Sequence, residues 1–447
     1  MKRLRLSASV LAFTILFTAL AGCGSGSQST STATGGQTNS TAAVSETAKS
    51  EPVEIQFWDM VWGGSEYIQM ATQICEKYSE EHSGVKIKYQ STPWNNWYQT
   101  FATAIASGSA PDISTGAGYQ AFQFSQIGAI LPIDDVVADL KSAGKLDDFQ
   151  GDSVELLKYD GHYIALPWQR DIRVMWYRKD IFDQAGLQPP KNWTEFRDTA
   201  KKLTKGDVYG FAMGGSVNNG LQFLLSMMDN NGGGLFDENR NVAVNSDRNK
   251  ETFEFISQMA KDGSINPASA GFTDDDAEKA FASGKAAMYV GTPGLDDKYA
   301  ELQGKAYVMT PLEGPHGDKG ALNWINNIML YKDSKHQQET KEFLKWWSEN
   351  QKDLFTVGKM TALPVRDSFA SDEYYTKNEN RAAIVKDYVP IAKSTAANYS
   401  SLFPELNEIE GDSALKNAIQ GLILKKDPAK ILNDLQTAIE AVMKKAQ

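Results

Sequence analysis

The sequence predicts an α/β fold built as two domains. Segments with the alternation of strands are followed by segments with helical periodicity, an order typical of parallel sheets covered by helices. About 395 residues follow a polar N-terminal tract, more than one core commonly holds, and 41% of the chain is hydrophobic. Beyond residue 21 no apolar run is long enough to cross a membrane. Together these features predict a soluble body of two domains.

The first residues have the features of a secretory signal. Lys2, Arg3 and Arg5 precede an apolar run over residues 8–21, which is short for a membrane span. The run closes with Leu-Ala-Gly-Cys at 20–23, similar to a bacterial lipobox, in which Cys23 would receive a diacylglyceryl group. We therefore expect residues 1–22 to be a lipoprotein signal peptide. An ordinary signal peptide with a chance cysteine, or an uncleaved anchor, are the alternatives.

Residues 23–50 are predicted to be a lipid-anchored, disordered tether. They are almost entirely Ser, Thr, Gly, Ala, Gln and Asn, a composition that cannot bury enough apolar surface to fold. A coil of this length spans roughly 30 Å. The lipid anchor predicts a place on the outer face of the cell membrane of a Gram-positive bacterium. With Cys23 acylated, Cys75 would have no partner for a disulfide within the chain.

The body opens with strands and helices in turn. Strands are predicted at 53–58 and 85–89, and helices at 65–82 and 93–107. The pattern returns with strands at 172–177 and 208–213 around a helix at 194–204, for which Thr194 is the expected N-cap. After residue 245 helices dominate, with short strands at 286–290 and 325–331 and a final helix at 428–444.

Several segments carry a resemblance to a known family. They are AIASGSAPDI (104–113), GHYIALPW (161–168), MWYRKDIFDQAGLQPPKNWTEF (175–196) and AEKAFASGKAAMYVG (277–291). In this order they resemble the extracellular solute-binding proteins for sugars, of which maltose-binding protein is the best-known member. The resemblance covers the chain from about residue 53 to its end.

The resemblance implies a two-lobed, periplasmic-binding-protein-like fold of type II, with hinge crossings between the lobes. Residues 51–168 and 323–360 would form the N-terminal lobe, and residues 171–320 and 362–447 the C-terminal lobe. It also implies a carbohydrate ligand in an interlobe cleft that closes, and permease subunits of an ABC-type importer as partners. A monomer is expected.

The segment after a short predicted strand at 110–113 is one candidate site. Residues 114–118 lack bulk, so something can approach the backbone there, and open α/β sheets bind ligands beyond the carboxyl ends of their strands. Tyr119 and Gln120 match positions that contact sugar in the maltose-binding branch. Alternatively they only cap the following helix. Asp112 is interpreted as structural, accepting from nearby backbone donors.

The segment after Pro167 is a second candidate. Asp171 matches a family carboxylate that accepts from sugar hydroxyls, and charge-assisted bonds suit that task. Arg173 shares its face by strand alternation, and either donates to the ligand or holds Asp171. Trp168 is either a stacking surface or a plug in the hinge core.

Aromatic and amide side chains complete the predicted sugar site, because sugar C–H faces pack on flat rings and amides both donate and accept. Trp97 shares a helical face with Phe101 and Ile105 and is expected in the core. The helix-capping alternative stays open for the asparagines, and hinge support for Trp324. The remaining candidates are Trp62, Trp94, Trp324, Asn218, Asn219, Gln222 and Arg366.

Other classes of function fit less well. A net charge of −11 argues against nucleic acid and anionic lipid, leaving the lipid anchor as the contact with the membrane. The histidines lack ligand spacing, and no Walker A or Rossmann motif occurs, so no metal or cofactor is expected. A carbohydrate-active enzyme, or a receptor for a non-sugar solute, are the alternatives. Gly116 and Gly294 stand where the maltose-binding branch has tryptophans, so the ligand is not expected to be maltose.

Overall fold

The computed structural model describes residues 52–94, 96–216 and 218–445. The predicted signal peptide (1–22), Cys23 and the tether (23–50) lie outside the described residues. Within the described part, the predicted α/β class is confirmed: strands and helices alternate and two sheets form. No described helix is long and apolar enough to span a membrane.

The larger sheet has seven strands, in the order β12-β6-β11-β3-β1-β2 with β13 paired to β11. β1 is parallel to β2 and β3, whereas β11 is antiparallel to β3 and β6. The strands are β1 (Val53–Met60), β2 (Val85–Thr92), β3 (Ile113–Gly116), β6 (Leu166–Ile172), β11 (Ala321–Leu330), β12 (Leu363–Pro364) and β13 (Ala392–Lys393).

The smaller sheet has four strands, in the order β10-β7-β9-β8. Its central strand β9 is buried at every position, as expected where helices cover both faces. The strands are β7 (Val174–Arg178), β8 (Tyr209–Ala212), β9 (Ala286–Gly291) and β10 (Ala306–Val308). A separate hairpin pairs β4 (Lys158–Tyr159) with β5 (His162–Tyr163).

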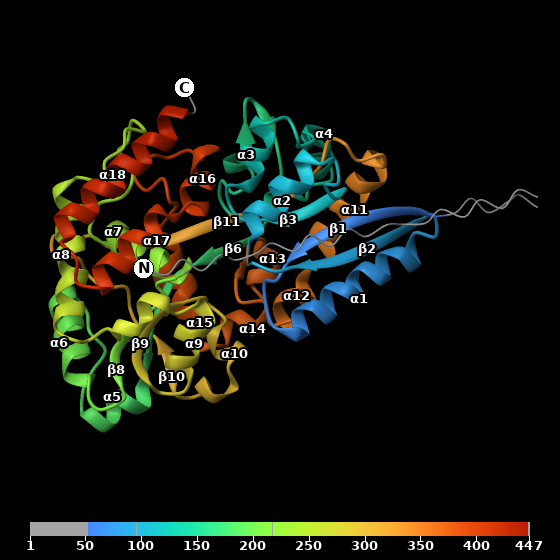
Figure 1. Ribbon diagram of the computed structural model, residues 1–447. Helices are drawn as coiled ribbons and strands as arrows, with labels where there is room; N and C mark the ends of the chain where they lie inside the picture. The colour runs from blue at the N-terminus through green and yellow to red at the C-terminus, as the bar shows by residue number, and fades with distance from the viewer. Residues whose placement is uncertain (1–51, 95, 217, 446–447) are drawn as a thin grey trace, which may run out of the picture. The chain divides into compact units, whose positions relative to one another are not determined.

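Consecutive strands connect the two sheets. β6 of the larger sheet ends at Ile172 and β7 of the smaller sheet begins at Val174, so only Arg173 separates them. β11 returns beside β6, with an irregularity in register at Asn326 and Asn327. Figure 1 shows β6 and β11 extending from the larger sheet toward α7 (Asn218–Asn230) and α17 (Ser413–Ile423). These crossings bring residues from distant parts of the chain together.

Amphipathic helices cover the sheets. In α1 the buried residues Tyr67, Ala71, Ile74 and Tyr78 recur at spacings of three or four and pack toward the sheet. Helices that share the core of the larger sheet are α1 (Ser65–Glu81), α2 (Trp97–Ala106), α3 (Gln120–Gln126), α4 (Asp134–Ser142), α11 (Gln337–Asn350), α12 (Lys352–Thr356) and α13 (Asp367–Ala370).

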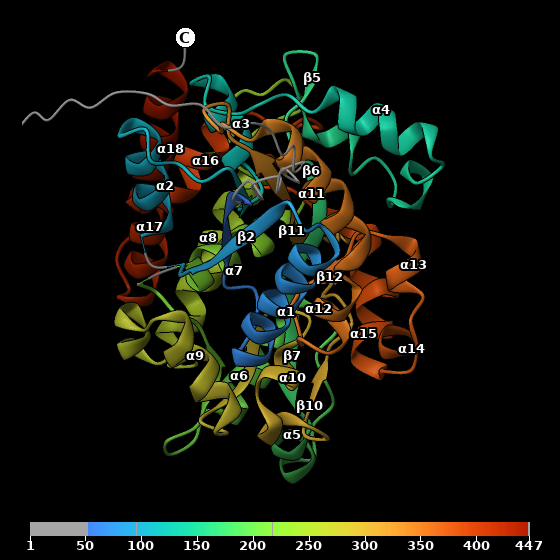
Figure 2. The same ribbon diagram turned by 90° about the vertical axis from the view of Figure 1, so that its right-hand side faces the viewer.

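The other helices lie on the smaller sheet or on the helices that cover it. Two of them, α14 and α15, are grouped with α13 along one side of the molecule in Figure 2. The remaining helices are α5 (Lys179–Ala185), α6 (Trp193–Leu203), α7, α8 (Asp247–Lys261), α9 (Asp274–Ala282), α10 (Leu295–Lys298), α14 (Glu373–Thr376), α15 (Glu379–Ala383), α16 (Glu405–Gly411), α17 and α18 (Pro428–Lys445).

Three details of the predicted elements are wrong. The strand expected at 172–177 is two strands in different sheets. Helix α6 is capped by Asn192, not Thr194, because the Asn192 side chain accepts from the Glu195 N–H at 3.0 Å and the helix already begins at Trp193. Helix α2 begins at Trp97, after Asn96 adopts a left-handed conformation (φ 58°), so Trp94 lies in the preceding loop.

Candidate ligand-binding site

The segment that crosses between the sheets holds a buried ion pair. Ile172 points into the core, so strand alternation places Asp171 and Arg173 on the opposite, common face, as predicted. The Arg173 guanidinium donates to both Asp171 oxygens, with Nη2 3.0 Å from Oδ2, and its Nε donates to Gln222 Oε1 at 2.6 Å. The Asp171 side chain keeps 16% of its surface exposed and Arg173 only 8%. In this arrangement Arg173 holds Asp171, while the Asp171 side chain keeps a small exposed part.

Trp324 lies over this pair. It is the register partner of Asp171 across β6 and β11, and the Arg173 guanidinium lies 5.0 Å from its ring centroid. A Cβ at Gly118 would stand 3.0 Å from the Trp324 ring, so glycine is needed there for the ring to approach the backbone. The Gly-rich end of β3 therefore makes room for the protein's own side chains: Met329 and Gln120 would come even closer to a Cβ at Gly116.

A glutamate that the sequence did not single out holds the Trp324 indole. Glu410 on α16 accepts from Trp324 Nε1 at 2.8 Å and from the Thr395 hydroxyl. Burial raises the pKa of Glu410 to about 7, against the lowering effect of these hydrogen bonds and of Arg173. Glu410 and Thr395 thus come from the far end of the chain to join Asp171, Arg173, Gln222 and Trp324, which we call the Asp171 group.

Tyr119 and Gln120 are buried among protein groups. The Tyr119 hydroxyl accepts from the Thr395 N–H at 2.9 Å, and Gln120 Oε1 accepts from the Ala117 N–H at 3.0 Å. Their exposed fractions are 1% and 0%. Tyr119 occupies the N-cap position of α3 without a side-chain capping bond. Contact of either residue with a ligand stays a prediction.

The amide side chains of α7 divide into two kinds. Asn219 is buried, donates to the Tyr289 hydroxyl at 2.9 Å and accepts from the Gly214 N–H at 2.9 Å, so its amide is occupied by the fold. Asn218 and Gln222 are half-buried, and Gln222 contacts Arg173.

The N-terminal end of α7 also meets a carboxylate. Asp274, in the first turn of α9, accepts from the Asn219 N–H at 2.8 Å, and burial raises its pKa to about 6. Its charge also interacts with that of Arg173. The run Thr-Asp-Asp-Asp at 273–276 signals a capping box, so its local pattern did not indicate that Asp274 lies near Arg173.

Three tryptophans form a second, aromatic group beside the larger sheet. The Trp62 ring lies 4.8 Å from that of Trp94 and 5.7 Å from that of Trp168, both edge-on. Trp62 and Trp168 are buried, whereas Trp94 is half-buried. Trp97, expected in the core, is also only half-buried, next to fully buried Phe101. Trp94 is therefore the member of this group whose ring keeps the most access to solvent.

A buried hydrogen-bond network fixes Trp62. Its Nε1 donates to Thr115 Oγ1 at 3.0 Å, and Thr115 donates to Asp59 Oδ1 at 2.7 Å. Tyr67 and Tyr89 donate to the other Asp59 oxygen at 2.6 and 3.1 Å. Burial raises the pKa of Asp59 to about 6, although these bonds lower it. Asp59 and Thr115 position the ring without reaching the Asp171 group themselves.

Arg366 lies apart from both groups. It is buried, donates to Asp148 at 3.1 Å and to the Ser348 hydroxyl at 3.1 Å, and stacks 4.1 Å from the Phe149 ring. It lines an open groove of about 260 Å³ with Lys145 and Glu349, among others. The structure does not bring Arg366 to Asp171.

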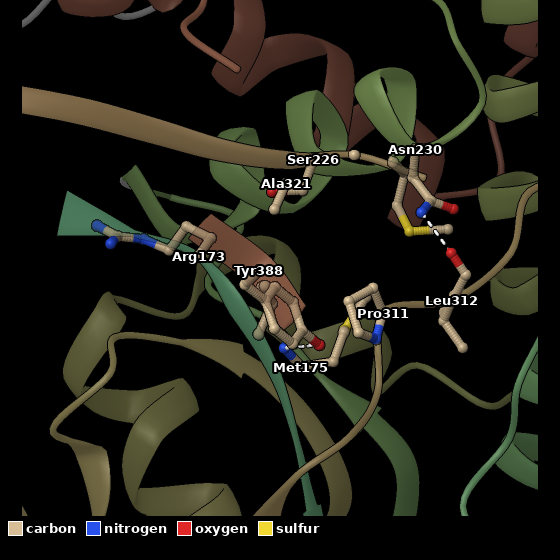
Figure 3. Close-up of a pocket in the computed structure, with 11 residues that line it drawn as sticks. Arg173, Met175, Ser226, Asn230, Pro311, Leu312, Ala321 and Tyr388 are labelled. Atoms are coloured by element: carbon tan, nitrogen blue, oxygen red, sulfur yellow. Dashed lines mark hydrogen bonds between the residues drawn. The ribbon is translucent and has the colours of Figure 1, made fainter. Parts of the chain in front are cut away.

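A small cavity lies behind Arg173, beside the smaller sheet (Figure 3). Its volume is about 20 Å³, enough for one water. Met175, Ser226, Asn230 and Tyr388 are among its lining residues, and the Arg173 guanidinium points away from them. The cavity is therefore distinct from the polar face that carries Asp171.

Residues 64–353 match the family model described as bacterial extracellular solute-binding protein. The chain belongs to this family. A solved sugar transporter from Arthrobacter chlorophenolicus A6, with bound laminaribiose, is 38% identical with a TM-score of 0.83, over 87% of this chain and 99% of that one. The arabinooligosaccharide-binding protein of Bacillus subtilis is 26% identical over 76% of this chain and 79% of its own length.

A more distant structure shows the shared fold alone. It is the maltose-bound MalE3 of T. maritima, 16% identical with a TM-score of 0.75 over 87% of this chain and 99% of that one. The predicted two-lobed, maltose-binding-protein-like architecture is thereby confirmed.

Proposed function

We propose that the protein is an extracellular carbohydrate receptor that delivers its ligand to the permease subunits of an ABC-type importer. One observation carries the proposal: Asp171, Arg173, Gln222, Trp324 and Glu410 gather where the chain crosses between the sheets. The family membership, and the sugars named for the relatives, support the same class of ligand.

The chemistry of this group suits a sugar. A hydroxyl donates well to a carboxylate, and Asp171 is held in one orientation by two bonds from Arg173. The half-buried Trp94 ring offers an apolar surface for sugar C–H groups beside the larger sheet. The Trp324 indole is buried, so it supports Asp171 and Arg173 from within the fold. Laminaribiose is the first candidate to test.

Ligand binding is proposed to close the two lobes. Asn407 on α16 donates to Gln123 on α3 at 2.6 Å, and the Gln123 amide donates to the Tyr98 hydroxyl at 2.9 Å. These bonds join helices assigned to different lobes, and we propose that they belong to the closed state. A ligand that prefers this state shifts the population toward it.

Outside the cell, the receptor is proposed to be held on the membrane by lipid. Acylation of Cys23 would follow removal of residues 1–22, and residues 23–50 would tether the body to the surface of a Gram-positive cell. Two acyl chains suffice for stable anchoring. We propose a monomer, without a cofactor.

We propose that the site binds without hydrolysing. Glu410 has the raised pKa that a general acid needs, but hydrolysis also needs a second carboxyl free to act across the bond, and both oxygens of Asp171 accept from Arg173. The relatives bear the names of binding proteins or transporters. Chromatography after prolonged incubation with laminari-, arabino- and galacto-oligosaccharides should recover the sugars intact, and any shortened product would contradict this part.

Isothermal titration tests the function directly. The protein without its signal peptide is titrated with the same sugars, and at least one should bind and raise the melting temperature, since ligand at 100 times Kd stabilises by about 2.7 kcal/mol. Asp171→Asn should weaken that binding. Asp148→Asn, in the Arg366 groove, is the control and should bind normally. Absence of binding to every carbohydrate in the panel would contradict the proposal.

A further inference from the structure

The two carboxylate oxygens of Glu410 have different surroundings. Its Oε1 accepts both the Trp324 indole N–H, at 2.8 Å, and the Thr395 hydroxyl. No described residue donates to Oε2, and this oxygen is not among the fully buried atoms that lack a partner. Glu410 as a residue is half-buried. One oxygen therefore fixes Trp324, while the other is left for a group outside the fold.

The positive charges near Glu410 are already engaged. The Arg173 guanidinium donates hydrogen bonds to Asp171 and Gln222. Arg170 falls on the opposite face of β6 by strand alternation and donates toward Asn323 at 3.4 Å. Lys393, on β13, donates to Asn398 at 3.3 Å. Lys393 keeps its charge, because Asn398 is neutral, but Arg173 is the cation that acts most on Glu410, and it is paired with Asp171.

We propose that Glu410 determines specificity at the carbohydrate site, where Oε2 accepts a ligand hydroxyl and its charge disfavours sugars that carry a carboxylate or phosphate. The proposal rests on the proposed function. A hydroxyl group gains a charge-assisted bond there, whereas an anion would meet a second negative charge in a poorly solvated place. The receptor therefore selects neutral oligosaccharides.

A matched pair of ligands tests this selection. Laminaribiose and the same disaccharide with one C6 hydroxymethyl oxidised to a carboxylate differ only at the discriminating group. Because burial raises the pKa of Glu410 to about 7, binding is compared at about pH 8.5, where the carboxylate is ionised. There the unmodified protein should bind the neutral form at least about tenfold more tightly, the scale of one charge-assisted hydrogen bond. Because this comparison needs no variant, it does not depend on whether a substitution folds.

Glu410→Gln then separates the charge from the shape. Glutamine can still accept from Trp324 through its carbonyl oxygen, so the ring stays in place while the negative charge is lost. The preference for the neutral sugar should fall by about tenfold. Glu408→Gln is the matched control on the same helix, because Glu408 pairs with Lys445 at 3.0 Å instead of Trp324, and it should keep the preference.

The outcomes distinguish the two proposals. Equal binding of both disaccharides by the unmodified protein, or an unchanged preference in Glu410→Gln, would overturn the role of Glu410 while leaving a carbohydrate receptor. If laminaribiose does not bind, the neutral and carboxylated forms of whichever panel sugar does bind are compared in the same way. Failure of every neutral sugar would overturn the proposed function itself, and the role of Glu410 with it.

Discussion

The buried pair between Asp171 and Arg173 supports a prediction in which stability and binding separate. Asp171→Asn removes the carboxylate and leaves Arg173, with 8% of its side chain exposed, as a buried cation held by Gln222 and a neutral amide. Breaking a buried pair from one side costs about 3–5 kcal/mol. Because Asp171 is 16% exposed and asparagine can still accept one bond, we expect a loss of about 2–3 kcal/mol in the free energy of unfolding.

Urea unfolding and isothermal titration measure the two effects. Asp171→Asn should unfold at lower urea and bind the cognate sugar at least about tenfold more weakly, since a charged acceptor is lost. Adding Arg173→Gln removes the stranded cation, so the double variant should regain about 1–2 kcal/mol of stability relative to the sum of the single changes. Its affinity should stay low.

A second ion pair in the same lobe provides the control. Arg178 donates from Nε and Nη2 to the two oxygens of Asp180 at 2.8 and 2.7 Å, with the same spacing of two residues, but at the opposite end of β7 from Arg173. Asp180→Asn should lower stability and leave affinity unchanged. An Asp171→Asn variant with the original unfolding midpoint, or single changes that simply add, would refute the reasoning.

The remaining predictions concern a buried acid, the lipid anchor and the aromatic group. Burial raises the pKa of Asp229 to about 8. The folded protein therefore binds the carboxyl proton of Asp229 more tightly than the unfolded chain does. The stability that this bound proton contributes is complete below about pH 4 and is lost as the pH rises toward 8. Thermal unfolding should show Asp229→Asn stabilising the protein by about 1 kcal/mol or more at pH 8 and little at pH 4; an equal shift at both pH values would contradict it. Cys23→Ala should release the protein from the membrane fraction and abolish labelling by radioactive palmitate, and retained label would disprove lipidation there. Trp94→Ala should weaken sugar binding by about 1–3 kcal/mol with a small loss of stability, because its ring is half-buried, whereas Trp168→Ala should cost about 3–5 kcal/mol of stability through the cavity it leaves. Equal stability losses in these two variants would contradict the distinction.

Local pattern determined much of the fold and one part of the candidate site. The alternation of strands and helices gave the α/β class, because a period of two or of 3.6 residues is a property of neighbours in sequence. The same period placed Asp171 and Arg173 on one face, and their ion pair confirms it. Asp112 also has its predicted structural task, accepting from the Gln56 N–H at 2.8 Å.

Only the tertiary structure decided which side chains accompany Asp171. Glu410 and Thr395 reach Trp324 from helices and loops far along the chain, and nothing in their own segments marks them. Trp62 follows the same rule: it is a predicted sugar contact, yet Trp94, Trp168 and the Asp59–Thr115 network enclose it. Sequence fixes what a side chain can do chemically and which face of its own strand or helix it takes. Its exposure and its partners depend on segments that meet only when the chain crosses between the sheets.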